Sequence, residues 1–277
     1  MNILQTKIKI GIEKPVTLMH ISDTHLTLAD NRDNERKNVL AKERKAGCFP
    51  HNDEQMAEIE NFARRTGDTI LHIGDLIDFV SEANLEKAKA FTDEFDVFMS
   101  AGNHEFSLYV GEAVEDEAYR NQSLDKVQAS FKNDIRFSVR RIGGVKFIAI
   151  DNSYYRFDEE QYAKLEKELA SDEPSVLMMH NPLYEKSLYD ISMKYWHNGC
   201  AYLVNMPEEL MKDYPQDWYV QQKADEITEK TTELILKSSC VKAILCGHVH
   251  FDFESEVKPG LCQYVTGRET IREITVI

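Results

Sequence analysis

Residues 69–78 have the sequence Thr69-Ile70-Leu71-His72-Ile73-Gly74-Asp75-Leu76-Ile77-Asp78. Residues 69–73 form a short, mostly apolar and β-branched run that ends at a glycine, and such a run predicts a buried strand. Asp75 lies at the carboxyl end of this strand, where open α/β sheets bind their ligands. A buried carboxylate is costly there unless positive charge meets it. The stretch therefore predicts an α/β fold with a polar site at a strand end.

Four other predicted strands also end in polar side chains. Residues 16–21, 96–100, 175–179 and 241–246 are followed, in this order, by Asp23 and His25, by Asn103 and His104, by His180, and by His248 and His250. Where two of these residues are separated by one, both side chains point the same way on an extended backbone. Carboxylate, amide and imidazole ligands together suit Mn, Fe or Zn. We interpret Asp75 as a carboxylate shared between two divalent ions and expect the other groups to complete that site.

The composition excludes some classes of protein. The chain has 277 residues, with 33 basic and 48 acidic side chains and a net charge of −15. This balance argues against a general nucleic-acid binder, which needs a basic surface. The five cysteines include no CxxC pair, so we expect free thiols in a reducing compartment. No signal peptide and no apolar run of about 18 residues is found, so we expect a cytoplasmic protein without a membrane partner.

The periodicity of the remaining sequence predicts one domain over residues 1–277. Ile8, Ile10 and Ile12 alternate with polar residues, as in an edge strand. Residues 26–52 form an irregular, charged excursion. Amphipathic helices are expected at 53–65 (with Asn52 as N-cap), 85–95, 112–132, 158–170 and 221–237. A hairpin is expected over 137–150, and antiparallel strands at 251–257, 263–266 and 271–277 close the fold.

Two stretches each allow two interpretations. Residues 32–45 contain six basic and three acidic side chains, and they form either a solvated helix or loop or a basic flap beside an anionic substrate. Residues 183–219 contain both tryptophans and six of the twelve tyrosines, without a clear period. They form either an aromatic insertion that simply packs on the body or a lid that selects the organic half of a substrate. Aromatic faces would suit a nucleoside or another aromatic group.

The ordered motifs Asp-x-His, Gly-Asp, Gly-Asn-His-Glu, His and Gly-His-x-His, from Asp23 to His250, resemble the calcineurin-like metallophosphoesterase superfamily. The resemblance implies a four-layer αββα sandwich of two mixed β-sheets flanked by helices, which is α/β, or α+β in some schemes. It implies two metal ions, with Asp75 as a ligand of both. Asp23, His25 and His250 complete the ligands of one ion, and Asn103, His180 and His248 complete those of the other.

The resemblance also implies a reaction. A metal-bridging hydroxide would attack the phosphorus of a phosphodiester or small phosphomonoester, with His104 as the general acid and Asp78 orienting it. The serine/threonine protein phosphatase branch has two phosphate-binding arginines that Ala101 and Phe79 replace here, so smaller esters are the better candidates. Arg268 could replace one of these arginines. The alternatives are a nuclease-type phosphodiesterase and a non-catalytic, metal-bound interaction scaffold.

Overall fold

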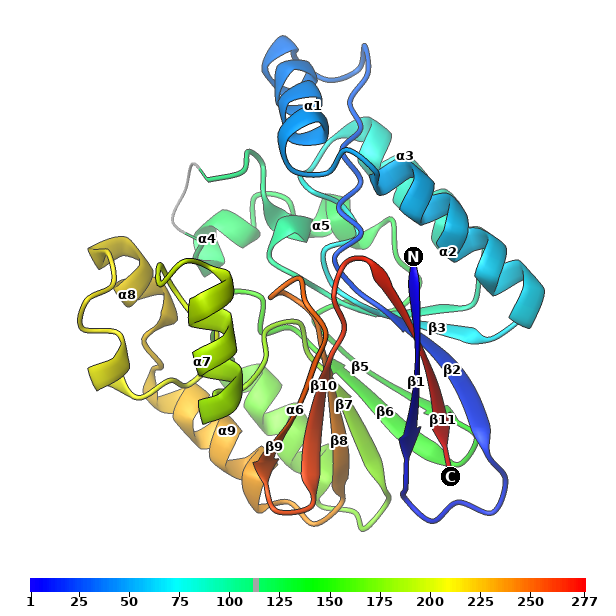
Figure 1. The fold of residues 1–277 in the computed structure, drawn as a ribbon, viewed down its shortest axis with the longest axis vertical. Helices are drawn as coiled ribbons and strands as arrows, with labels where there is room; N and C mark the ends of the chain where they lie inside the picture. The colour runs from blue at the N-terminus through cyan, green and yellow to red at the C-terminus, as the bar shows by residue number, and fades with distance from the viewer. Residues whose placement is uncertain (112–114) are drawn as a thin grey trace.

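The computed structural model describes residues 1–111 and 115–277 and has two β-sheets packed face to face, with helices on both outer faces (Figure 1). One sheet has the strand order β1-β11-β2-β3-β4, and the other has the order β5-β6-β7-β8-β10-β9. Both sheets are mixed, because β2-β3-β4 and β6-β7-β8 pair in parallel whereas β11-β2 and β5-β6 pair antiparallel. The predicted sandwich of two mixed sheets flanked by helices is confirmed.

The strand bounds follow the apolar runs of the sequence closely. The first sheet consists of β1 (Asn2–Ile8), β2 (Val16–Ile21), β3 (Thr69–Ile73), β4 (Val97–Ser100) and β11 (Thr270–Val276). The second sheet consists of β5 (Phe137–Ile142), β6 (Val145–Ile150), β7 (Ser175–Met178), β8 (Val241–Cys246), β9 (Phe253–Lys258) and β10 (Leu261–Val265).

The helices cover the two outer faces and the end of the sandwich where the site lies. The α-helices are α1 (Glu35–Gly47), α2 (Asn52–Thr66), α3 (Glu82–Glu94), α4 (Glu117–Arg120), α5 (Leu124–Gln128), α6 (Glu159–Leu169), α7 (Lys186–Tyr195), α8 (Gln216–Gln222) and α9 (Glu226–Lys237). Short 3-10 turns lie at His104–Phe106 and Glu208–Leu210. In Figure 1, α2 and α3 lie along the first sheet, and α6 and α9 lie along the second. No helix among the described residues is long and apolar enough to cross a bilayer.

Alternating side chains of the strands fill separate cores. In β3, Ile70 packs with the residues of α2 and α3, whereas Leu71 and Ile73 belong to the core between the sheets. In β6, Ile148 packs with the residues of α6 and α9, whereas Phe147 faces the first sheet. Each fully buried side chain of this size stabilises the fold by about 1.5–3 kcal/mol. Because both faces of the central strands are buried in this way, their register is fixed and so are the positions of their carboxyl ends.

Several predicted elements are wrong in their bounds. The alternation over Ile8, Ile10 and Ile12 was assigned to a strand, but β1 ends at Ile8 and Gly11 turns the chain with a φ of 83°. Ile10 and Ile12 still pack against the core between the sheets, which explains the misleading pattern. The edge strand of this sheet is β1, which lies before the predicted stretch and shares only Ile8 with it. The closing strands are not purely antiparallel, because β11 pairs in parallel with β1 and β10 pairs in parallel with β8.

The helix predictions failed where tertiary contacts override local preference. The excursion over 26–52 contains α1, which agrees with the solvated helix that was one interpretation of residues 32–45. The helix expected over 112–132 is two short helices, α4 and α5, in the part of that range that is described (residues 112–114 lie outside it). The helix expected from residue 221 begins at Glu226, because Asp225 caps it. Asn52 is not the N-cap of α2, since its amide donates to the carbonyl of His25 at 2.7 Å and to Thr27.

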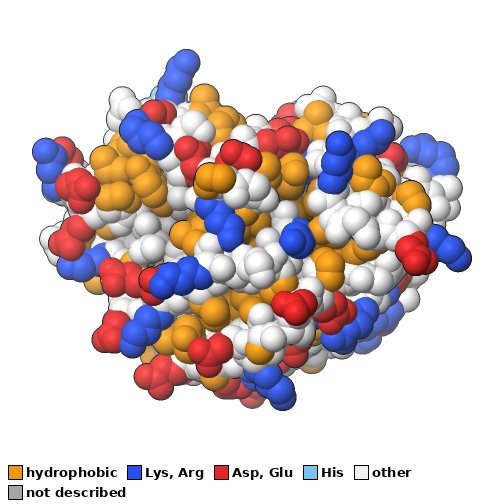
Figure 2. All heavy atoms as spheres, turned by 90° about the horizontal axis from the view of Figure 1, so that it is seen from below, with side chains coloured by type: hydrophobic (Ala, Val, Ile, Leu, Met, Phe, Trp, Pro, Cys, Tyr) orange, Lys and Arg blue, Asp and Glu red, His pale blue; other side chains and the backbone are white. Residues whose placement is uncertain are grey.

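The charges on the surface are mixed. On the face shown in Figure 2, Lys and Arg side chains are interspersed with Asp and Glu side chains and with hydrophobic ones. A nucleic-acid footprint would be a continuous basic stripe.

Candidate active site

The predicted site residues meet at one end of the sandwich, in the loops that follow five strands. All seven predicted metal ligands and both predicted catalytic residues belong to this cluster, which comprises Asp23 and His25 after β2, Asp75 and Asp78 after β3, Asn103 and His104 after β4, His180 after β7, and His248 and His250 after β8. Parallel neighbours end at the same edge of a sheet, which is why these distant segments converge.

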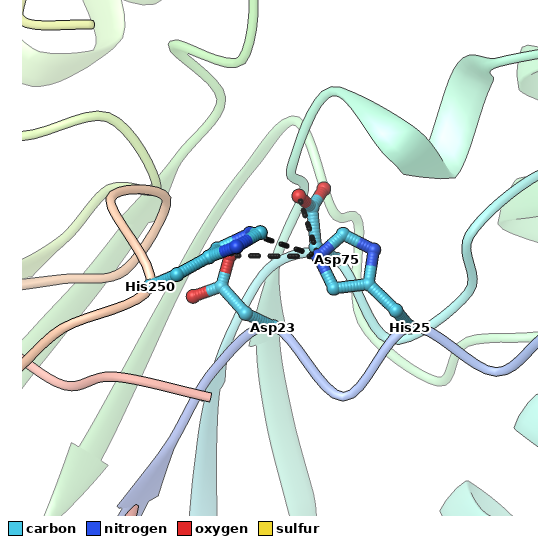
Figure 3. Close-up of side chains that lie close together, drawn as sticks. All are labelled: Asp23, His25, Asp75 and His250. Atoms are coloured by element: carbon cyan, nitrogen blue, oxygen red, sulfur yellow. Dashed lines mark hydrogen bonds and ion pairs between the residues drawn. The ribbon is translucent and has the colours of Figure 1, made fainter. Parts of the chain in front are cut away.

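The first group of potential ligands consists of Asp23, His25, Asp75 and His250, which point toward one another (Figure 3). One atom from each lies within 4.8 Å of the others. The Nε2 atoms of His25 and His250 are 3.2 Å apart, and His250 Nε2 is 3.5 Å from Asp23 Oδ1. Two imidazole nitrogens and two carboxylates converging on one point form a donor set that a divalent transition metal accepts.

The second group shares Asp75 with the first and adds His180 and His248. Asp75 Oδ2 lies 3.2 Å from His180 Nε2 and 3.6 Å from His25 Nε2, so the same oxygen faces both groups. His248 Nδ1 is 3.3 Å from His180 Nε2. Asp75 therefore lies between the imidazoles of the two groups.

Asn103 lines the cavity beside the second group. Its amide nitrogen donates to Glu115 at 3.3 Å, whereas its Oδ1 is buried without a hydrogen-bond partner among the described residues. A buried polar atom without a partner is unusual and calls for a ligand or an ion. The donor set and this oxygen therefore fit a second cation.

Backbone strain is concentrated in the same loops. Five of the potential ligands have positive φ angles, a conformation uncommon outside glycine: Asp23 (58°), His25 (45°), Asp75 (56°), His248 (72°) and His250 (65°). Such strain persists only where the surrounding structure imposes it, and it clusters at functional sites. Two glycines leave room for the carboxylates, because a Cβ on Gly102 would lie 2.6 Å from the backbone nitrogen of Asp75 and one on Gly247 would lie 2.7 Å from Asp23 Oδ2.

The buried carboxylates of the site are stabilised by positive charge near them. Burial raises the pKa of Asp23, and Asp75 adds to that rise. Burial also acts on Asp75, but His180 and His104 hold the pKa of that carboxyl well below its usual value. Burial lowers the pKa of His180, yet Asp75 outweighs this effect and raises it to about 9. Burial keeps the pKa of His248 and His250 well below the usual value, which leaves these imidazoles neutral, as metal ligation requires.

His104 and Asp78 form a pair beside the first group. His104 Nδ1 lies 3.0 Å from Asp78 Oδ1 and 2.8 Å from the backbone oxygen of Asp78. Burial lowers the pKa of His104, but Asp75 and Asp78 raise it to about 10. Arg44 binds the same carboxylate, and burial of Asp78 is outweighed by Arg44, His104 and His25, which hold its pKa well below the usual value. The imidazole of His104 therefore holds a proton beside the cavity.

Sequence reasoning assigned no role to two residues that support the site. The carboxylate of Glu105, the last residue of the Gly-Asn-His-Glu motif, accepts backbone N–H bonds from Asp75, Leu76, Ile77 and Gly102, and so ties the β3 loop to the β4 loop. Burial and Asp75 raise the pKa of Glu105 to about 8, and the N–H bonds oppose this rise. Tyr155 Oη lies 2.8 Å from His248 Nε2, which leaves Nδ1 of that imidazole for the metal group. Tyr155 follows β6 without any pattern that could have revealed it.

Other predicted residues have different places. Arg268 lines the cavity and donates to the carbonyl of Cys48 at 3.0 Å. His20 and His72 are fully buried beneath the site, and His51 and His197 are exposed. Residues 151–153 hold strand ends: Asn152 donates to the carbonyl of Asn181.

A cavity of about 770 Å³ opens beside the two groups. Its wall includes Asn103, His104 and Glu115 and four aromatic residues of the 183–219 stretch, which are Tyr195, Trp196, Tyr202 and Trp218. Such a volume is typical of sites for small organic ligands.

The fold recurs in solved structures. A dimetal phosphatase from Danio rerio is 14% identical, and the match covers 91% of this chain and 87% of that chain with a TM-score of 0.54. A putative 5'-nucleotidase from Staphylococcus aureus is also 14% identical; 92% of this chain and 49% of that chain are covered, with a TM-score of 0.46. At 14% identity, the likeness to the dimetal phosphatase shows the fold alone. A comparison with curated proteins gives no match.

The sequence itself matches a family model. The match spans residues 16–252 and thus contains every predicted site residue from Asp23 to His250. Since it covers most of the chain, and since the two-sheet fold agrees with it, the protein belongs to the calcineurin-like phosphoesterase family.

Proposed function

We propose that the protein is a dinuclear metal-dependent phosphoesterase that hydrolyses a small phosphomonoester or phosphodiester. The observation that carries this proposal is the position of Asp75 Oδ2, 3.6 Å from His25 Nε2 and 3.2 Å from His180 Nε2. One carboxylate oxygen thus serves two ligand groups. The mixed ligand types suit Mn, Fe or Zn without selecting one of them.

One ion would be held by Asp23, His25, Asp75 and His250, and the other by Asp75, Asn103, His180 and His248. Two such ions, when bound, neutralise charge on a phosphoryl group and lower the pKa of a water molecule that attacks phosphorus. The unpartnered Oδ1 of Asn103 supports the second of these sites.

The protein's own acid in this proposal is His104. Because Asp78 occupies Nδ1 of its imidazole, the proton available to a substrate is the one on Nε2. As the bond from phosphorus to the leaving oxygen breaks, that proton passes to the oxygen. General acid catalysis of this kind contributes about 10²–10⁴ to a rate.

We further propose that residues 183–219 form a lid that selects the organic half of the substrate. Two of its rings contact candidate ligands edge-on: Trp196 lies 5.7 Å from His250 and Tyr202 lies 5.8 Å from His248, measured between ring centroids. A metal pair binds any phosphate ester, so discrimination requires surfaces that contact the leaving group. These aromatic faces border the cavity where that group would lie.

The test of function is a substrate screen with Mn, Fe or Zn added. Phosphomonoesters, cyclic nucleotides and other phosphodiesters are assayed with the wild-type protein and with Asp75→Asn as the background. We expect at least one class to be hydrolysed by the wild type alone. Metal bound at two equivalents with no hydrolysis above the background would favour the scaffold alternative.

The test of the lid replaces residues 183–219 by a Gly/Ser linker. If the stretch is a lid, KM for the preferred substrate rises much more than KM for a small generic ester such as p-nitrophenyl phosphate. If the aromatic residues only pack on the body, both kcat/KM values fall together with the fraction of folded protein, which circular dichroism measures on the same samples.

A further inference from the structure

Among the described contacts, the basic stretch 32–45 meets the candidate active site at Arg44. Arg32 pairs with Asp30 and Glu86, and Lys45 pairs with Asp53, both outside the site. Arg44, on the last turn of α1, instead extends to Asp78. Its side chain is 20% exposed, whereas that of Asp78 is fully buried.

The contact between Arg44 and Asp78 is a two-bonded fork. Arg44 Nε donates to Asp78 Oδ2 at 2.7 Å, and Nη2 donates to Oδ1 at 2.8 Å. The remaining nitrogen, Nη1, lies 3.3 Å from Cys48 Sγ. A fork of this kind fixes the plane of a carboxylate, which a lysine cannot do. Three of the five N–H groups of the guanidinium are directed at Asp78 and Cys48, so the side chain is aimed at the carboxylate although it also borders the cavity.

Stacking holds the guanidinium from a second side. Its central carbon lies 5.0 Å from the centroid of the Phe49 ring, and Phe49 in turn stacks on His25, with 4.2 Å between centroids and an interplanar angle of 13°. Arg44, Phe49, His25 and Asp78 therefore form one closed ring of contacts. A side chain held on two sides keeps its geometry better than one held by a single ion pair.

The Asp78 carboxylate that Arg44 holds also lies against two imidazoles. Its Oδ1 lies 3.0 Å from His104 Nδ1 and 3.2 Å from His25 Nδ1. The same carboxylate oxygen thus faces Nδ1 of both rings at ion-pair distance. His104 Nδ1 also bonds the backbone oxygen of Asp78 at 2.8 Å, and both rings have Nε2 left for the chemistry. A rotation of the carboxylate would withdraw this oxygen from the candidate acid and from a candidate metal ligand at once.

We propose that Arg44 is a positioning residue: its guanidinium fixes the plane of the Asp78 carboxylate, and this plane sets the orientation of the His104 ring toward the leaving oxygen. The inference rests on the proposed phosphoesterase function. It assigns α1 to the catalytic machinery, a part of the chain that carries none of the motifs of the family.

The experiment compares Arg44→Met and Arg44→Lys with Lys45→Met, a control on the same helix whose side chain pairs only with exposed Asp53 among the described contacts. Outer partners of a site typically contribute 10–100-fold to activity. We expect both Arg44 variants to lose about 10–100-fold in kcat on an alkyl phosphate, to lose much less on p-nitrophenyl phosphate, and to keep KM. Lys45→Met should behave as the wild type.

Two readouts do not depend on turnover. In metal-free protein labelled with ¹⁵N-histidine, the Nδ1–H signal of His104, assigned with His104→Ala, should change its chemical shift in Arg44→Met, because the carboxylate oxygen moves while the bond to the backbone oxygen of Asp78 remains. Thermal unfolding reports whether each variant is folded. Arg44→Lys, which keeps the charge, serves if Arg44→Met does not fold.

Several outcomes would overturn the inference. A raised KM with unchanged kcat, or full activity in Arg44→Lys, would make Arg44 a source of charge for the substrate. An equal loss on both esters that follows the loss of folded protein would make its role structural. The proposed function is tested separately by His104→Ala: if this variant shows no leaving-group dependence, the acid assignment fails, whereas a dependence in His104→Ala that is absent in both Arg44 variants rejects the positioning role alone.

Discussion

Gly102→Ala provides a sharp test of the metal site because this glycine lies against the shared ligand. An alanine Cβ at this position would lie 2.6 Å from the backbone nitrogen of Asp75 and 2.9 Å from its Cγ, with Oδ1 closer still. Carbon contacts of this kind need more than about 3 Å, and backbone atoms cannot rotate away, so the Asp75 loop must move by several tenths of an ångström. Metal–ligand distances tolerate only about 0.2 Å.

This steric overlap should lower both the folding stability and the metal affinity of Gly102→Ala. Overpacking of a filled site destabilises a fold by about 1–3 kcal/mol, which for a chain of this size lowers Tm by about 2–12 °C. Displacement of a metal-site group typically lowers metal affinity by about 10–100-fold. Urea unfolding of metal-free protein measures the first quantity, and elemental analysis after dialysis against a series of metal concentrations measures the second.

A matched control is Gly47→Ala at the end of α1. A Cβ there would meet no atom within 4 Å, so we expect unchanged metal binding and a stability equal to the wild type or up to about 1 kcal/mol higher. If Gly102→Ala keeps wild-type stability and binds two metal equivalents as tightly as Gly47→Ala, then the packing of this loop does not determine the position of Asp75, and our account of the site is wrong.

Three further predictions concern ligands and protons. Asp75→Asn should lose most bound metal and activity because the bridge loses its charge; full occupancy by elemental analysis with intact activity would contradict the assignment. His104→Ala should keep its metal but lose about 10²–10⁴ in kcat on alkyl esters and less on p-nitrophenyl phosphate; steady-state kinetics that show equal losses would count against the acid role. Because the pKa of His180 is about 9 and a ligand imidazole must be neutral, metal binding at pH 7 should release a proton, and metal affinity should rise about tenfold per pH unit toward pH 9. Calorimetry in buffers of different ionisation enthalpy measures the number of protons released, and a number of zero would contradict this prediction.

Much of the fold could be predicted because the buried strands are marked by composition. In β3, the run Thr69–Ile73 is apolar because both faces are covered, and Gly74, with a φ of 82°, ends it at a conformation that few other residues adopt. The helix over residues 112–132 was mispredicted because its acidic composition suits a helix, whereas the described part breaks where Ser123 donates to the carbonyl of Phe106. That contact joins residues 17 positions apart, and local periodicity does not encode it.

The candidate site could be predicted to the extent that its residues follow strands. Each predicted ligand occupies the first few positions after an apolar run, so the strand pattern predicted that these residues meet at one edge. Their division between two ions and the roles of His104 and Asp78 came from the family resemblance. Arg44, Phe49 and Tyr155 come from a helix or a loop, and their approach depends on how those segments fold back over the sheets. No spacing within the sequence reports such an approach, and the basic stretch around Arg44 was therefore left with two interpretations.

The strand order of the first sheet has a consequence for how the chain is made. β11 lies between β1 and β2, although it follows every other described strand along the sequence. Until residues 270–276 leave the ribosome, β2 has an open edge on this side, and β1, which pairs with β11 throughout its length, has no partner. Open strand edges invite pairing with other chains, and long-range pairing slows folding. A nascent chain that stalls before residue 270 should therefore carry all the metal-binding motifs and yet be prone to aggregate. Chaperones should be needed most in the interval before β11 covers the open edges of β1 and β2.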